Sequence, residues 1–106
     1  MRKKTTTDAQ KILAYIAGKD PKRQQQFEEE LANREVASRI FQLREQAGIS
    51  QAELARRVGT TQSVISRLED ADYAGHSLAM LNRIAAAVER RVEIRFVPRK
   101  RRLQPA

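Results

Sequence analysis

Three polar side chains near the middle of the chain, Gln62, Ser63 and Arg67, have the chemistry to read the edges of DNA bases. A glutamine can hold adenine through two hydrogen bonds, an arginine can hold guanine in the same way, and a serine has several partners. The apolar residues of the same stretch are Val64, Ile65 and Leu68. This spacing places the polar side chains on the outer face of one helix. For such a helix taken alone, an ordinary solvated face is the alternative.

The residues before this helix predict a second short helix and a tight turn. Ser50 is a natural N-cap, and Glu53 follows three residues later, as in a capping box. Gly59 suits the end of this helix because glycine turns the chain at little steric cost. Thr61 can cap the following helix, which we expect to span 62–69. The apolar face of the first helix is formed by Leu54, Ala55 and Val58. Two capped helices around a glycine turn match a unit that docks on DNA, which favours base reading over a solvated face.

The stretch SQAELARRVGTTQSVISRLE resembles the helix-turn-helix of the Xre family of phage-repressor-like regulators, with a similarity that extends over about residues 36–88. The resemblance implies that Gln62, Ser63 and Arg67 read bases and that Gln51 contacts a phosphate. It also implies an ion pair between Arg44 and Glu69. Further contacts to the DNA backbone are expected from Thr61, Ser66 and Asn82.

Charge and composition limit the other possible functions. The net charge of the 106 residues is +8, which favours a polyanionic partner. Residues 1–34 carry a net +3, residues 35–89 a net −1 and residues 90–106 a net +6, so the excess lies in the two ends. These ends could contact phosphates or serve only solubility. The sparse aromatic residues offer no stacking platform for RNA.

The residues that metal and redox chemistry need are scarce. The chain has no cysteine and one histidine, so we expect no disulfide, no metal site, no cofactor and no enzymatic activity. The run Glu69-Asp70 with Asp72 is explained by the end of a helix and a turn. There is no apolar run of about 20 residues and no signal peptide pattern. We therefore expect no membrane association and a bacterial cytoplasmic location, with the chain on the nucleoid when bound.

The N-terminal part predicts two further helical segments. Thr7 can cap a helix over 8–17 whose apolar side chains, Ile12, Leu13 and Ile16, need a partner, either this chain's own domain or another protein. Asp20-Pro21 starts the next segment, which Gly48 ends. Its apolar positions are Phe27, Leu31, Val36, Ile40, Phe41 and Leu43. Their spacing shifts near Ala32-Asn33, so 20–47 is either one helix or two. The run Glu28 to Glu30 is either a solvated face or a site for a basic partner.

The C-terminal part predicts a last helix and then a strand. Ser77 can cap a helix over 78–89, with Leu78, Leu81, Ile84, Ala85 and Val88 returning to the core. From Arg91 to Val97 the pattern changes to alternation, in which Val92, Ile94 and Phe96 share one face. A lone strand leaves backbone groups unpaired, so we expect it to pair across an interface with a second copy or with a partner protein. An extended arm packed on the helices is the alternative.

These features together predict an all-α fold: a five-helix repressor-like helix-turn-helix bundle with an extra N-terminal helix and one C-terminal β-strand that pairs between chains. The expected organisation is an N-terminal partner-binding region at 1–34, a DNA-binding domain at 35–90, and the strand with a basic tail at 91–106.

The layout over residues 8–98 resembles antitoxins of the HigA type. The resemblance rests on DAQKILAYIAGKDP, on GTTQSVISRLEDADYAGHSLAMLNRIAAAVERRVEIRFVP and on the terminal strand. It implies a dimer that represses its own operon at a pseudo-palindromic operator on double-stranded DNA, and that neutralises a RelE/HigB-like ribonuclease toxin by contact. The side chains expected to contact the toxin are Ile12, Leu13, Ile16 and Phe27. The chain departs from the acidic charge that would suit a basic ribonuclease, which makes apolar burial the better route to binding. A stand-alone regulator and an interacting protein without DNA binding remain the alternatives.

Overall fold

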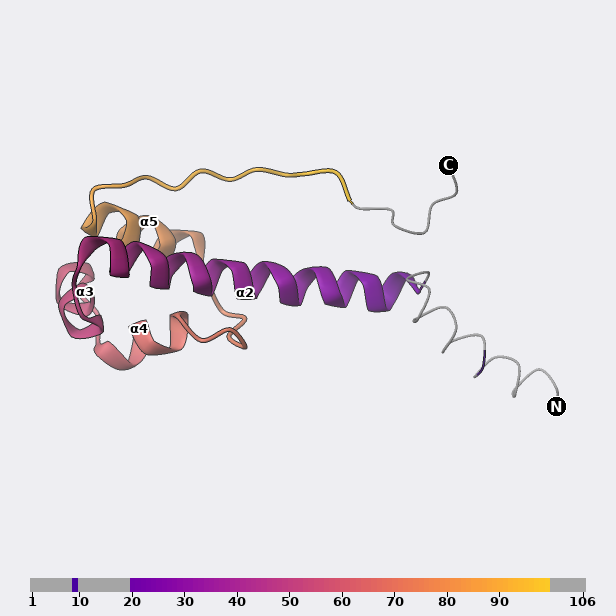
Figure 1. The fold of residues 1–106 in the computed structure, drawn as a ribbon, viewed down its shortest axis with the longest axis horizontal. Helices are drawn as coiled ribbons and strands as arrows, with labels where there is room; N and C mark the ends of the chain where they lie inside the picture. The colour runs from indigo at the N-terminus through magenta and orange to yellow at the C-terminus, as the bar shows by residue number, and fades with distance from the viewer. Residues whose placement is uncertain (1–8, 10–19, 100–106) are drawn as a thin grey trace. The chain divides into compact units, whose positions relative to one another are not determined.

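The computed structural model describes Ala9 and residues 20–99 of the chain, and its described residues form four helices and no strand. The helices are α2 (Pro21–Ala47), α3 (Gln51–Val58), α4 (Gln62–Leu68) and α5 (Leu78–Ala87) (Figure 1). Two compact units can be distinguished. One consists of Glu30–Arg95, and the other of Met1–Glu29 with Phe96–Ala106. The all-α prediction is confirmed at this level. The helix predicted over 8–17 lies outside the described residues, apart from Ala9.

The α2 helix is a single helix of 27 residues, so the interruption considered near Ala32-Asn33 is absent. Asp20 caps its start, because Oδ1 of Asp20 accepts a hydrogen bond from the backbone N–H of Lys22 at 3.1 Å. At its other end Gly48 has a φ of 67°, and Gly48 N–H donates to the carbonyl of Glu45. The left-handed backbone at Gly48 is a common helix terminator that a side chain would disfavour.

The core lies in the unit formed by Glu30–Arg95. Its buried side chains come from all four helices, as Ile40, Leu54, Ala55, Val58, Ile65, Leu68 and Ile84. Ile40, Leu54, Ile65 and Ile84 are the largest of the fully buried side chains. The inward faces predicted for α3 and α4 are thus confirmed, with Val64 half-buried at the edge. One predicted core position is wrong, because Leu78 begins α5 with 52% of its surface exposed.

Several apolar side chains of α2 are exposed rather than buried. Phe27, Leu31 and Phe41 keep 60%, 48% and 45% of their surface exposed, whereas Ala37 and Ile40 are buried. The helix therefore packs only one narrow side of its C-terminal half against the bundle. The shift in apolar spacing reflects these unburied side chains rather than a kink.

The end of α5 has an unusual backbone position. Arg90 N–H donates to the carbonyl of Ala85 at 2.7 Å, and Glu89 N–H donates to that of Ala86 at 3.1 Å. This is the double hydrogen bond of a Schellman motif, in which the left-handed position is usually glycine. Here Glu89 occupies it with a φ of 60°.

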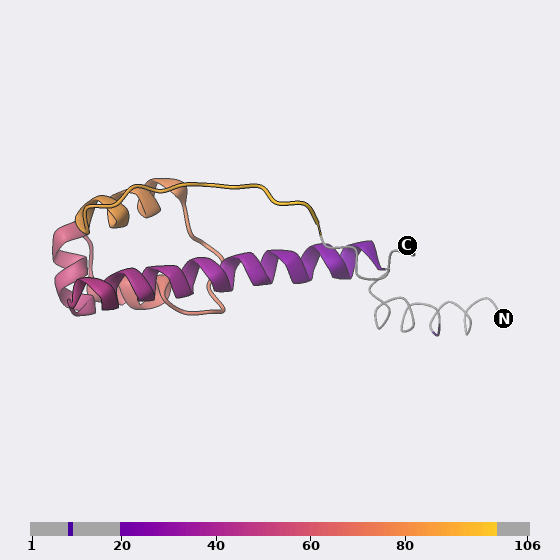
Figure 2. The same ribbon diagram turned by 45° about the horizontal axis from the view of Figure 1, so that its top comes forward.

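The strand predicted over 91–97 is absent from the single chain. Residues 90–99 belong to neither helix nor strand and run as one open stretch (Figures 1 and 2). A strand is defined by hydrogen bonds to a neighbouring strand. Among the described residues of this chain no other strand exists to supply them. The residues around Val92, Ile94 and Phe96 therefore have the alternating pattern of a strand but form no ladder of hydrogen bonds with another strand among the described residues.

Candidate nucleic-acid interface

The two helices α3 and α4 are set by local hydrogen bonds at their ends. Oγ of Ser50 accepts from Glu53 N–H at 3.1 Å, and Oγ1 of Thr61 accepts from Val64 N–H at 3.3 Å. Between them Gly59 has a φ of 86°, and its N–H donates to the carbonyl of Ala55. The left-handed backbone at Gly59 lets the chain change direction sharply between the two helices. The tight turn therefore joins one capped helix directly to the next.

The outer face of α4 is polar. Gln62, Ser63, Ser66 and Arg67 are all exposed, as is the capping Thr61. Their amide, hydroxyl and guanidinium groups are those that bond base edges and phosphates. Ile65 and Leu68 on the opposite side are buried, which holds the helix in the bundle. Within the part of the chain that the structure describes, Arg67 forms no salt bridge, so its guanidinium is available to a ligand.

The side chains of Arg44, Glu69 and Gln51 form a hydrogen-bonded network at the C-terminal end of α4. Nε of Arg44 lies 2.7 Å from Oε2 of Glu69, and Nη2 of Arg44 lies 3.1 Å from Oε1. The two side chains are only 11% and 5% exposed. Nη1 of Arg44 also donates to the carbonyl of Ile49 at 3.0 Å. The hydrogen bond to Glu69, more than any other contact, raises the pKa of Arg44, so the guanidinium remains charged. The pair joins the end of α2 to the end of α4.

Gln51 belongs to the same network. Its Nε2 donates to Oε1 of Glu69 at 3.0 Å, which ties the first turn of α3 to the end of α4. An amide nitrogen has two hydrogens, so one remains for an acceptor such as a phosphate. The phosphate contact expected of Gln51 stays a prediction, and the structure adds a bond to Glu69 that orients this side chain.

The turn between α3 and α4 is held from α5 by Arg83. Nη2 of Arg83 donates to the carbonyl of Val58 at 2.8 Å, with the carbonyl of Gly59 at 3.5 Å. A cation at the last carbonyls of a helix is favourable because the helix dipole is negative there. Sequence reasoning missed this cap, since Arg83 lies 25 residues beyond Val58. Asn82, the residue before Arg83, is predicted to contact the DNA backbone, and its side chain is exposed.

His76 anchors the loop that follows α4. Its Nε2 lies 2.8 Å from the carbonyl of Leu68, the last residue of α4. Because a carbonyl only accepts, Nε2 carries a hydrogen and donates it to Leu68. Nδ1 is buried and, among the described residues, has no hydrogen-bond partner. The ring also meets Tyr73 edge to face, at 5.1 Å between centroids. His76 therefore caps the end of α4 and fills the turn that follows it.

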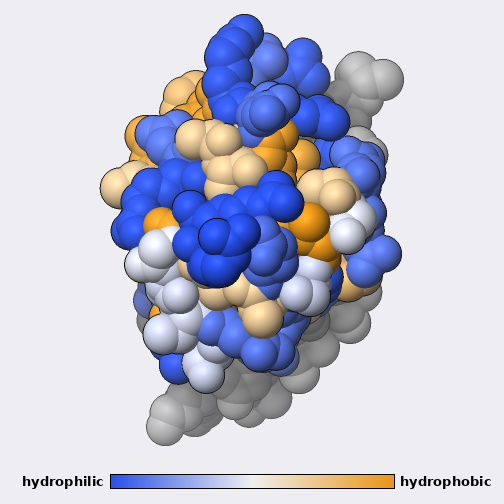
Figure 3. Space-filling model, turned by 90° about the vertical axis from the view of Figure 1, so that its left-hand side faces the viewer, coloured by the Kyte–Doolittle hydropathy of each residue, from blue (hydrophilic) through white to orange (hydrophobic). Residues whose placement is uncertain are grey.

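The outer face of α3 is occupied by a charge cluster. The carboxylate of Glu53 accepts from Nε of Arg56 at 3.1 Å and from Nε of Arg57 at 2.8 Å. Hydrogen bonds from Arg56 and then Arg57 lower the pKa of Glu53 to about 2. The predicted capping box is thus only half formed, because the carboxylate turns to the arginines rather than back to Ser50. Figure 3 views this end of the molecule, where hydrophilic surface predominates.

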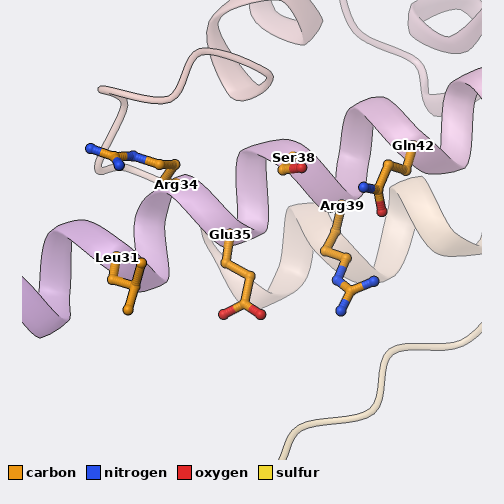
Figure 4. A pocket seen from close by; sticks show the side chains of 6 residues that line it. All are labelled: Leu31, Arg34, Glu35, Ser38, Arg39 and Gln42. Atoms are coloured by element: carbon orange, nitrogen blue, oxygen red, sulfur yellow. The ribbon is translucent and has the colours of Figure 1, made fainter.

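A shallow hollow of about 430 Å³ lies along α2, away from these features. Its lining is Leu31, Arg34, Glu35, Ser38, Arg39 and Gln42, all from one helix. Leu31, Glu35 and Arg39 project from the same side of α2 (Figure 4). Among the described residues no group of three potential metal ligands occurs. None of the described helices is long and apolar enough to cross a membrane.

The capped pair of helices with its exposed polar α4 defines a helix-turn-helix DNA-binding protein. A family model described as helix-turn-helix matches residues 40–93, half of the chain. The chain belongs to this family, in its phage-repressor-like or Xre type, and is by class a DNA-binding transcriptional regulator. Neither a curated protein nor a solved structure matches the chain.

Proposed function

We propose that this regulator is the antitoxin of a toxin–antitoxin pair and represses its own operon. It binds a pseudo-palindromic operator as a homodimer, with half-sites about one helical turn apart. The observation that carries the DNA-binding part is the outer face of α4. Its exposed Gln62, Ser63 and Arg67 stand on a helix capped by Thr61 and held at its other end by the Arg44–Glu69 pair. These three side chains read bases, while Gln51, Thr61, Ser66 and Asn82 contact the DNA backbone.

The second part of the proposal is direct contact with a RelE/HigB-like ribonuclease toxin. It rests on the resemblance of residues 8–98 to HigA-type antitoxins and on exposed apolar surface in α2. Phe27 keeps 60% of its surface exposed, and large exposed apolar side chains are typical of protein contacts. The other proposed contacts, Ile12, Leu13 and Ile16, lie outside the described residues. The chain binds the toxin by apolar burial and has no catalytic activity of its own.

The toxin contact is tested by isolating the tagged chain from its native cells after nuclease treatment, which removes DNA that could link two proteins. Mass spectrometry then identifies what remains bound. We expect a stoichiometric small RelE-like protein, lost when Ile12 and Ile16 are made polar or when Phe27→Ser is introduced. The matched control is Leu78→Ser, which removes another apolar side chain that is more than half exposed, this one from α5, and should leave the complex intact.

The same experiment decides between the two candidate regulators. Recovery of the chain alone, while the product of the neighbouring gene is expressed, would identify a stand-alone phage-repressor-like regulator. DNA binding is tested separately, by mobility shift on the DNA upstream of the gene. Absence of a sequence-selective shift would contradict the repressor part of the proposal.

A further inference from the structure

The segment Arg91 to Val97 has two chemically different faces, and no strand among the described residues of the chain pairs with it. Ile94 and Phe96 are 59% and 97% exposed, while Val92 is half-buried. The intervening side chains, Arg91, Glu93 and Arg95, are all exposed and alternate in charge. The backbone of this stretch belongs to neither helix nor strand (Figure 2). Both its apolar face and its backbone are thus open to a second chain.

The charges of this segment complement a second copy of the same segment. In an antiparallel pair, residues directly opposite each other lie on the same face. With a two-fold axis at Ile94, Glu93 lies opposite Arg95 of the second copy, and Arg95 lies opposite its Glu93. On the other face, Val92 meets Phe96 and Ile94 meets itself. Opposite charges and apolar pairs are both stabilising across strands.

Two other axes place like charges together. An axis at Glu93 sets that carboxylate against its own copy and Arg91 against Arg95. An axis at Arg95 sets two guanidinium groups against each other. Like charges directly opposite destabilise a strand pair. The charged face therefore excludes both of these registers.

The remaining axes on the apolar face conflict with the backbone. An axis at Val92 requires residues 88 and 89 to pair as a strand opposite Phe96 and Arg95. Glu89 has a left-handed backbone with a φ of 60°, and Val88 packs against the core, so neither can do so. An axis at Phe96 brings Pro98, which has no N–H, opposite Ile94. Only with the axis at Ile94 does every residue from 91 to 97 lie opposite a residue of the same segment in the second copy.

We propose that residues 91–97 pair antiparallel with the same residues of a second copy, with the two-fold axis at Ile94. The self-complementary charges favour this occupant over an unrelated protein, which would have to repeat the pattern in reverse. The inference deepens the homodimer of the proposed function and rests on it. It adds the register, the axis and the residue pairs that join the two copies.

Single cysteines test the register directly, because the chain has no cysteine of its own. In the full-length protein under mild oxidation, Ile94→Cys should form a disulfide-linked dimer, since opposite Cα atoms lie about 4.5–5.5 Å apart. Val92→Cys and Phe96→Cys should each fail alone, because identical residues would be about 13 Å apart. A mixture of these two variants should cross-link, because each faces the other across the axis.

Charge variants test the pairing without a covalent bond. Because each pair occurs twice, Glu93→Arg should weaken dimerisation about tenfold, and so should Arg95→Glu. The double variant with both substitutions restores opposite charges at each pair and should dimerise as the original chain does. A mixture of the two single variants should form the heterodimer in preference to either homodimer. Analytical ultracentrifugation measures all four, with circular dichroism to check that each variant is folded.

The outcomes separate this inference from the homodimer on which it rests. Cross-linking of Val92→Cys alone, or a stable dimer that Ile94→Cys never cross-links, would overturn the register and leave the homodimer standing. A monomeric original chain would overturn both, while DNA and toxin binding would still be judged by their own assays. Cross-linking only at Ile94 and in the mixture would establish the axis.

Discussion

Arg44 and Glu69 meet through two hydrogen bonds between the guanidinium and the carboxylate, at 2.7 and 3.1 Å, although 25 residues separate them. The pair stands where the ends of α2 and α4 come together, with Gln51 of α3 bound to the same carboxylate. Side chains from α2 and α3 thus both bind the carboxylate at the C-terminal end of α4. An ion pair buried to this degree adds little net stability over an apolar substitute, but removal of one partner leaves a buried charge.

The first prediction follows from that asymmetry. Glu69→Ala should lower the free energy of unfolding by about 3 kcal/mol, because it leaves the Arg44 guanidinium buried without its carboxylate. The double variant Arg44→Met with Glu69→Leu should recover much of the loss. Urea denaturation followed by circular dichroism measures both. Glu53→Ala is the matched control at a carboxylate that also binds arginine but is 30% exposed, and a loss there as large as at Glu69 would contradict the role of burial.

The second prediction concerns base reading by α4. Gln62→Ala and Arg67→Ala should each weaken binding to the operator by about 1–3 kcal/mol, because each removes a bidentate contact to a base. Binding to unrelated DNA should change far less. Fluorescence anisotropy on both DNAs provides the comparison, with Gln42→Ala and Arg39→Ala on α2 as controls of the same residue types. Equal losses on the two DNAs would exclude base reading by these side chains.

A third prediction tests the cap from α5. Arg83→Met should lower the free energy of unfolding by about 1–2 kcal/mol, because the last carbonyls of α3 lose a charged donor. Asn82→Ala beside it should have little effect on stability. Thermal unfolding of the two variants shows whether the contact matters. If Arg83→Met unfolds at the temperature of the original chain, the bond to Val58 contributes nothing to the turn.

A fourth prediction is the pH dependence of the α3 charge cluster. The two arginines hold the folded-state pKa of Glu53 at about 2, below the usual 4.5. A depressed folded pKa contributes stability above the unfolded value, and that contribution is lost as the pH falls from about 4.5 through 2. Glu53→Gln should therefore lose less stability over this range than the original chain. NMR titration of the Glu53 carboxyl gives the pKa itself, and a midpoint near 4.5 would exclude the effect.

The fifth prediction is a stabilising substitution at the end of α5. Glu89→Gly should raise the free energy of unfolding by about 0.5–1 kcal/mol, because glycine adopts the left-handed backbone of the Schellman motif without strain. Glu89→Ala keeps the strain and serves as the control. Parallel denaturation curves measure the difference between the two. A glycine variant no more stable than the alanine variant would show that the backbone at this position is not strained.

Sequence reasoning succeeded where the physics is local. Ser50, Gly59 and Thr61 were predictable because a cap bonds a backbone group two to four residues away, and the buried faces of α3 and α4 follow from helical spacing. The contact of Arg83 with Val58 was not predictable, since it depends on how α5 crosses the end of α3. The carboxylate of Glu53 can bond either the backbone N–H of Ser50 or the side chains of Arg56 and Arg57. Both contacts are local, so the sequence alone does not decide between them. The strand could not form in one chain, because its ladder needs a partner.

The base-reading residues and the domain limits stay predictions from the sequence. The structure places Gln62, Ser63 and Arg67 on one exposed face of α4, and their contact with bases stays a prediction. The division at Glu30 and Arg95 reflects packing within the chain, whereas the predicted limits at 34 and 90 were drawn from function.

The single histidine of the chain offers a spectroscopic reporter at the end of α4, the helix proposed to read DNA. Its Nε2 donates to the carbonyl of Leu68, while Nδ1 is buried and, among the described residues, has no hydrogen-bond partner. Because the two ring nitrogens have different surroundings, they should give separate ¹⁵N signals, with no other imidazole in the spectrum to obscure them. Movement of the loop beyond α4 on contact with an operator would break this arrangement and merge or shift the signals. One isotope label thus allows the recognition helix to be followed in solution, without any substitution in the chain.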